Sequence, residues 1–154
     1  MITLVVGGLM LPGALAASPV SATNSGNEGC TPGYWKNHTD NWFEDDVTPI
    51  PVSKTLTSAG FLPSSVPGSH TLLMALEYHG GPGAAGAERI LLRAAAAAWL
   101  NAAHEGLGYP YRRDGDPGDI VNSVNTAIGS GNRAQMIALA TLLDDANNLG
   151  CPLN

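Results

Sequence analysis

The chain has 154 residues, of which 13% are charged, and its seven Lys and Arg against thirteen Asp and Glu give a net charge of −6. This length is close to the common size of a single domain and is enough to bury a real core. The acidic balance does not provide the basic surface that binds nucleic-acid phosphates, so we expect no nucleic-acid partner.

The first 17 residues, MITLVVGGLMLPGALAA, are apolar and uncharged and end in the small-residue pattern Ala14-Leu15-Ala16. That ending is typical of a secretory signal peptide, and the stretch is too short and too rich in glycine and proline to span a membrane. It also lacks a basic start, so a second interpretation stays open, in which residues 1–17 persist as an extended tail. Such a tail needs a groove in its own domain or in a neighbouring copy. The tail residues expected to mediate assembly are Ile2, Leu4, Val5, Val6 and Leu9.

Residues 18–29 are rich in Ser, Gly and Asn and predict a flexible linker, which leaves 30–154 as a single domain. Cys30 and Cys151 stand at opposite ends of that domain. In an exported protein such a pair is most simply a disulfide, which here closes a loop of 121 residues (151 − 30). A bridge between two subunits is the alternative.

Residues 30–42 read CTPGYWKNHTDNW and concentrate aromatic side chains in a protein that has few of them. We expect Tyr34, Trp35 and Trp42 to anchor this segment against the alanine run 94–98, whose small side chains leave room for large rings. Exposed aromatic rings also stack on sugars, so a carbohydrate platform is the competing interpretation.

Three segments together resemble a pattern known from other proteins. They are CTPGYWKNHTDNW at 30–42, LLRAAAAAWLN at 91–101 and LDDANNLG at 143–150. Their order and spacing are similar to a family of secreted and cell-surface domains of bacteria and archaea, whose motifs are T-x-G-Y-W-K-N-H-P-x-W, A-A-K-L-N and L-D-x-Y-N-N-G. The resemblance implies secretion and a helical fold and carries no settled activity. We count Trp99 and Asn101 of the central segment among the structural motif residues.

Helical periodicity and capping residues predict about four helices after residue 68. The expected segments are 69–79, capped by Ser69, then 86–104, then 119–128, capped by Asp119, and 132–149, capped by Asn132. The 86–104 segment contains the alanine run, and small side chains let partner helices approach closely. We therefore expect it to be the central helix of a bundle.

Residues 47–68 contain four prolines and predict an irregular wrap with one helical turn at 54–59. No segment of the domain predicts a strand. The sequence thus predicts a mainly α fold, a small bundle of about four helices with an irregular N-terminal wrap and an extended N-terminal tail.

No set of nucleophile, base and orienting group can be assembled from the sequence, so we assign no catalytic residue and no cofactor. His38 and three further histidines admit a transition-metal site, but a structural hydrogen bond is the more usual role of such a residue. The acidic runs 44–46 and 114–119 lack the spacing of a calcium loop, and we interpret them as solvated charges and as a polar turn that caps a helix. No metal ligand is assigned.

Three functional hypotheses follow from these patterns. The first is a non-enzymatic, secreted structural or interaction protein at the cell surface, self-assembling as a homo-oligomer or as a linear polymer that forms a filament. The second is a secreted module that binds a surface glycan or a metal. A secreted hydrolase is the weakest of the three, because no catalytic constellation is present in the sequence.

Overall fold

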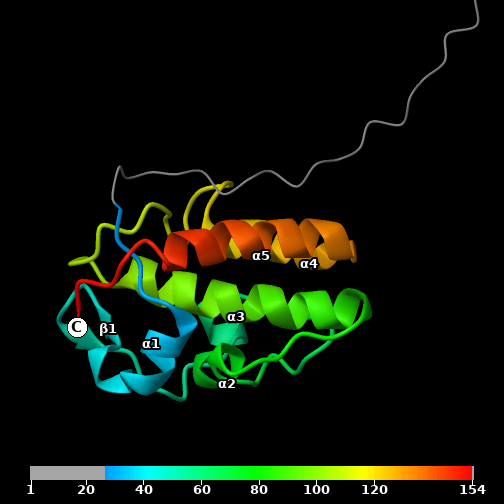
Figure 1. Cartoon of the computed structure of the whole chain (residues 1–154). Coiled ribbons are helices and arrows are strands. Elements are labelled where there is room, and N and C mark those ends of the chain that lie inside the picture. Colours follow the sequence, from blue (N-terminus) through cyan, green and yellow to red (C-terminus); the bar gives the residue numbers. More distant parts are fainter. Residues whose placement is uncertain (1–26, 154) are drawn as a thin grey trace, which may run out of the picture.

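Helix α3 (Gly83–Ala103) runs through the middle of the computed structural model, which describes residues 27–153. Helices α4 (Ile120–Gly129) and α5 (Arg133–Asn147) pack on one side of it, and the short helices α1 (Pro32–Asn37) and α2 (Leu72–Leu76) pack on the other (Figure 1). The predicted mainly α bundle is therefore confirmed. The predicted tail residues Ile2, Leu4, Val5, Val6 and Leu9 and the linker up to residue 26 lie outside the described residues.

The alanine run explains why α3 is central. Ala94 is 4% exposed and Ala95 to Ala98 are fully buried, and Trp99 beside them is 3% exposed. Methyl side chains on several sides of a helix let more than one element approach its backbone. Within the described residues, α3 contacts α1, α2, α4 and α5. The predicted burial of this run is confirmed.

Side-chain caps set where the helices begin. Asp119 and Asn132 accept hydrogen bonds from backbone N–H groups in the first turns of α4 and α5, as predicted. The prediction that Ser69 caps α2 is wrong. The cap is Thr71, whose side chain accepts from the Met74 amide, and the helix is correspondingly shorter than expected.

The aromatic segment and the residues that follow it contain regular elements that the sequence did not predict. The segment contains helix α1, because Thr31 caps it and Pro32 fits its first turn, where no amide donor is needed. A 3₁₀ turn, η1 (Thr39–Asn41), follows it. A short antiparallel hairpin, β1 (Phe43–Glu44) with β2 (Thr48–Pro49), comes next, so the expectation of no strand is corrected.

The wrap that follows the hairpin is irregular, as predicted, and contains the 3₁₀ turn η2 (Thr57–Ala59). Leu56 and Phe61 are fully buried and anchor it to the bundle. The loop after Phe61 is fixed by Glu88 of α3, which is 1% exposed. Its carboxylate accepts hydrogen bonds from the Ser64 amide at 2.7 Å, the Ser64 hydroxyl at 2.6 Å and the Ser65 amide at 3.0 Å. A buried charge is tolerated here because its oxygens are satisfied.

Helix α3 starts three residues earlier than predicted. Gly86, expected to be its first residue, lies inside the first turn and is buried against the preceding loop. A Cβ atom at this position would overlap the backbone of Gly81. Glycine is therefore required for the chain to fold back at the start of the central helix.

Candidate functional site

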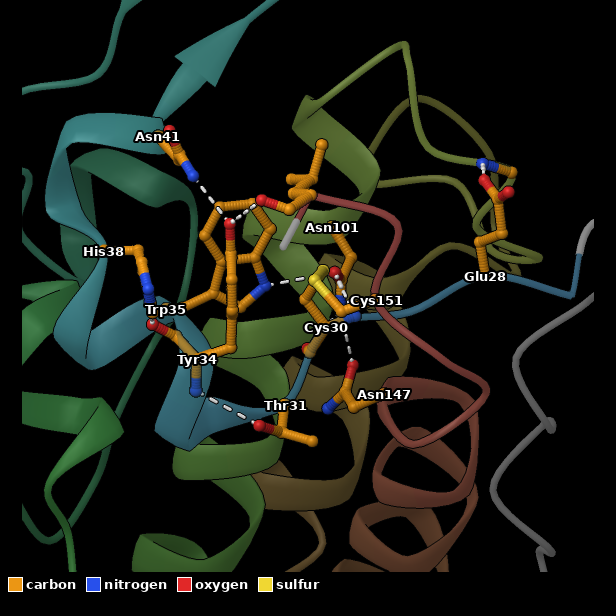
Figure 2. Close-up of a disulfide and its surroundings, with 12 residues drawn as sticks. Glu28, Cys30, Thr31, Tyr34, Trp35, His38, Asn41, Asn101, Asn147 and Cys151 are labelled. Carbon is orange, nitrogen blue, oxygen red and sulfur yellow. Dashed lines mark hydrogen bonds between the residues drawn. A yellow bond between two sulfur atoms is a disulfide. The ribbon is translucent and has the colours of Figure 1, made fainter.

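The disulfide between Cys30 and Cys151 forms the centre of the candidate site, with 4.5 Å between the two Cα atoms (Figure 2). The predicted bridge within one chain is confirmed. Cys30 is fully buried, and the neighbouring backbone adds a second connection, in which the Gly29 amide donates to the Gly150 carbonyl at 2.9 Å. The start and the end of the folded domain are thus joined both covalently and by a β-bridge.

Asn101, near the end of α3, supports the Cys30 side of this joint and is fully buried. Its side-chain oxygen accepts from the Cys30 amide at 2.8 Å and from the Trp35 indole N–H at 3.0 Å. Its side-chain nitrogen donates to the Cys30 carbonyl at 2.9 Å and to Asn147 Oδ1 at 2.9 Å. All four hydrogen-bonding positions of the amide are used, which is the condition for burying it without penalty.

Asn147, at the end of α5, is the second fully buried amide. Its oxygen also accepts from the Tyr109 hydroxyl at 2.9 Å, and its nitrogen donates to the Ala94 carbonyl at 3.0 Å. Burial raises the pKa of Tyr109 above its ordinary value, so its hydroxyl keeps its proton and remains a donor. This buried amide network consists of Asn101, Asn147, Tyr109, Trp35 and the Cys30 backbone.

The network brings together the three sequence segments that resemble a family pattern. Segment 30–42 contributes Cys30 and Trp35, segment 91–101 contributes Asn101, and segment 143–150 contributes Asn147. Segments that lie far apart in the sequence therefore meet at one point, and the side chains that meet there are buried. What these contacts do is hold the N-terminal segment, the central helix and the last helix in one arrangement.

Tyr34 and His38 form the outer edge of the site (Figure 2). Their rings stack with centroids 4.2 Å apart, and His38 Nδ1 lies 2.9 Å from the Tyr34 carbonyl oxygen. The Tyr34 hydroxyl donates to the Leu153 carbonyl at 3.0 Å and accepts from the Asn41 side chain at 2.6 Å. His38 is therefore a structural contact, as predicted, and Tyr34 fastens the C-terminal residues to α1.

The tryptophans of the motif are buried, which excludes the competing carbohydrate-platform interpretation of Tyr34, Trp35 and Trp42. Trp35 is fully buried, Trp42 is 1% exposed and Tyr34 is 9% exposed. The Trp42 indole N–H donates to the Trp35 carbonyl at 3.0 Å. A ring whose faces are covered by protein cannot stack on a sugar, so these residues are core anchors.

Trp99 lies on the other side of α3 from this network and is coupled to the hairpin. Its indole N–H donates to the Ala59 carbonyl at 3.0 Å, and the Arg113 guanidinium lies 4.7 Å from its ring centroid. Arg113 in turn donates to Glu44 of β1 at 2.7 Å. That hydrogen bond lowers the pKa of Glu44, so the pair stays charged at neutral pH.

The histidines do not gather into a metal site. Within residues 27–153 no group of three or more His, Cys, Asp or Glu side chains is arranged to hold a metal ion. His104 lies 2.6 Å from Asp46, while His70 lies 2.7 Å from the Tyr78 hydroxyl. Asp119 accepts hydrogen bonds from the amides of Asp116 and Asn122, so the acidic run 114–119 is a capping turn, as predicted.

A hollow of about 430 Å³ opens at the C-terminal end of α3, next to the buried network. Its wall is mostly polar and comes from the end of α3, from β1 and from the loop before α4. The charged and aromatic lining residues are Glu44, Asp45, His104, Glu105, Tyr109, Tyr111, Arg112, Arg113 and Asp114. Arg113 is neutralised by Glu44 and by Asp114, which it contacts at 3.0 Å.

Sequence reasoning found Asn101 but missed Asn147 and Tyr109. A signal for Asn147 was present, because it lies four residues after Leu143 and continues the apolar face of α5 with a polar side chain. A polar residue on an apolar helix face predicts a buried hydrogen-bonding partner. Tyr109 lies in a loop with no periodicity, so nothing local marks it.

No helix of the described part of the chain is both long enough and apolar enough to cross a membrane. Comparison of the whole chain with protein-family models, with curated proteins and with solved structures found no match.

Proposed function

We propose that the protein is a non-enzymatic, secreted module of the cell surface, and that it assembles through its N-terminal residues as the subunit of a linear polymer or filament. The burial of the motif side chains supports this proposal. Trp35, Asn101 and Asn147 face each other in the interior and build a scaffold. The disulfide and a mainly α fold are compatible with an exported protein, since oxidising compartments preserve such bridges.

The observation that carries the proposal is the position of the disulfide joint relative to the N-terminal residues. Gly29 is paired with Gly150, and Cys30 with Cys151, so residues 1–26 leave a point that is covalently fixed to both ends of the domain. A pull on this point from a neighbouring subunit is passed through the disulfide to Cys151, after the end of α5, as well as along the chain to α1. Such a subunit suits a linear polymer that carries tension.

Electron microscopy of the protein as exported by its native host tests the proposal. We expect ordered, unbranched polymers that persist in non-reducing buffer. Monodisperse particles across the accessible concentration range would contradict it. Analytical ultracentrifugation of the same material provides a second readout that does not depend on adsorption to a grid.

One observation favours a second candidate, a secreted glycan-binding module. The hollow at the end of α3 combines Tyr111, which is partly exposed, with carboxylates that accept hydrogen bonds and guanidinium groups that donate them, and hydroxyl groups of a sugar can do both. A glycan-array screen of the intact protein tests this candidate. Binding that is lost in Tyr111→Ala and retained in Leu62→Ala, which lies outside the hollow, would support it.

A further inference from the structure

A second hollow, of about 570 Å³, lies where the ends of α1 and α2 meet the middle of α3, on the side of α3 that carries both short helices (Figure 1). Its charged and ionisable residues are Lys36 of α1, Glu77 and His79 from the end of α2 onward, and Arg93 of α3. The wall is more polar than apolar, and its remaining residues are Leu76, Tyr78, Gly80 and Ile90. It shares no lining residue with the hollow at the C-terminal end of α3. We call it the α1–α2–α3 hollow.

The two cations of this hollow have no carboxylate partner. Within residues 27–153 the ion pairs belong to His104, Arg112 and Arg113, and neither Lys36 nor Arg93 forms one. Both of these side chains are exposed. In a chain with a net charge of −6, a lysine and an arginine that line one hollow without a counter-ion are a local exception. They give a small anion a place to bind.

Arg93 is anchored through only one of its donors. Its Nε–H donates to the Leu76 carbonyl at the end of α2 over 3.3 Å, and a guanidinium has five N–H donors. The two Nη groups have no acceptor among the described residues of the chain. A guanidinium in this state can donate two parallel hydrogen bonds to a planar carboxylate, while the lysine beside it acts as a point charge.

Glu77 on the same wall determines which anion is matched best. Lys36, Arg93 and Glu77 together give the wall a net charge of +1 (two positive and one negative) when His79 is neutral. A singly charged carboxylate fits this balance better than a doubly charged phosphate monoester, because Glu77 repels the second charge. Ionised Glu77 is also an acceptor for hydroxyl groups of a ligand.

The remaining wall suits a small ligand that carries hydroxyl groups. The volume of the hollow falls in the range of about 300 to 1,000 Å³ that small-molecule sites occupy. Burial raises the pKa of Tyr78, so its hydroxyl stays neutral and adds no negative charge. Ile90 is partly covered and offers an apolar contact for one face of a sugar ring.

We propose that the α1–α2–α3 hollow binds the carboxylate of a small sugar acid through Lys36 and Arg93, and that Glu77 accepts hydrogen bonds from hydroxyl groups of the same ligand. This site does not depend on the proposed polymer. It also differs from the hollow at the end of α3, whose arginines are already paired with carboxylates.

Ligand-observed saturation-transfer NMR on the full-length protein tests the proposal, and it serves for monomers and polymers alike. The probe is sodium D-glucuronate, titrated at constant ionic strength and neutral pH. The comparison ligands are D-glucose, which has no charge, and D-glucose 6-phosphate, which carries close to two. We expect saturable binding of glucuronate that is about tenfold tighter than that of either comparison ligand. Equal binding of glucose, tighter binding of glucose 6-phosphate, or no saturable binding of glucuronate would overturn the proposal.

Substitutions of the two cations locate the site. Arg93→Ala and Lys36→Gln should each weaken glucuronate binding by about tenfold, because each removes a charge-assisted hydrogen bond. Both residues are exposed, so circular dichroism should show an unchanged fold. The matched control is Arg112→Ala, which removes an exposed arginine from the hollow at the end of α3 and should bind glucuronate normally. Equal affinity in Arg93→Ala and Arg112→Ala would show that glucuronate binds elsewhere.

A substitution of Glu77 tests the charge balance separately. Glu77→Gln raises the net charge of the wall, so binding of glucose 6-phosphate should improve relative to glucuronate by several-fold. This variant keeps the size of the side chain and lies at an exposed position. The proposal expects the change in preference between the two ligands, and an unchanged preference would contradict the assigned role of Glu77.

Discussion

The side-chain nitrogen of Asn101 donates a hydrogen bond to the side-chain oxygen of Asn147 over 2.9 Å, and neither residue is exposed. This contact joins the central helix to the last helix at the level of the disulfide. Because each amide also binds other buried groups, the pair fixes the relative position of three segments that are distant in sequence. Buried polar networks of this kind specify one arrangement among many that would bury equal apolar area.

Replacing Asn101 by alanine should lower the free energy of unfolding by at least about 3 kcal/mol. The substitution leaves the Cys30 amide, the Trp35 indole N–H and one lone pair of Asn147 without partners, and each unsatisfied buried group costs about 1 to 3 kcal/mol. Urea denaturation measures the effect. Asn148→Ala is the matched control, since Asn148 is exposed and its side chain donates one hydrogen bond, to the Asp144 carbonyl, so it should lower stability by only about 1 kcal/mol or less. Equal losses in the two variants would contradict the network.

Removing the disulfide should destabilise the domain by about 4 to 5 kcal/mol, the loop-closure entropy of a 121-residue loop in the chain-entropy model. The comparison is between the unaltered protein and the double variant Cys30→Ala/Cys151→Ala, both followed by urea denaturation. Non-reducing peptide mapping should first show the bridge within one chain. Two free thiols, or a peptide pair from two different chains, would be inconsistent with this structure.

Ala97→Leu should cost about 1 to 3 kcal/mol, because Ala97 is fully buried and added methyl groups force neighbouring elements apart. Ala84→Leu, at an exposed position in the first turn of the same helix, serves as the control and should be close to neutral. Thermal denaturation distinguishes the two. An unchanged melting temperature in Ala97→Leu would mean that the alanine run is not at the centre of the bundle.

The stability of the domain should fall at acidic pH in a way that depends on Glu88. Burial alone would raise the pKa of Glu88, but the hydrogen bonds from Ser64 and Ser65 outweigh it and the net pKa is below its ordinary value. A lowered pKa in the folded state means that ionised Glu88 stabilises the fold above its unfolded pKa, near 4.3, and that this contribution is lost as the pH falls through the lower folded value. In Glu88→Gln the loss below about pH 4 should be smaller than in the unaltered protein. Parallel pH profiles of the melting temperature would argue against this role.

The central helix and the two helices after it could be predicted because their signals are local. Asp119 and Asn132 cap helices whose apolar residues repeat at the helical period, and the structure places both caps as expected. The alanine run predicted a helix with close neighbours, since small side chains permit close approach. The cysteine pair predicted the bridge from its position at the two ends of the domain.

Other features depend on contacts that periodicity does not report. Helix α1 is only six residues long, and it forms because Thr31 caps it and Trp35 is held by Asn101 from the distant helix α3. The hairpin turns at Asp45 and Asp46, which adopt left-handed backbone angles. No local sequence pattern predicted these angles. The early start of α3 depends on contact between Gly86 and Gly81. These are tertiary effects, and they override local propensity.

Deletion of residues 1–17 from the exported protein tests the central claim most directly. The account predicts that the shortened protein is a folded monomer by analytical ultracentrifugation and circular dichroism, while the full-length protein forms polymers under the same conditions. A full-length variant with serine at Ile2, Leu4, Val5, Val6 and Leu9 controls for length and should also remain monomeric, because it lacks the apolar side chains. Intact polymers formed by the shortened protein would contradict the account and leave only the disulfide-closed helical scaffold.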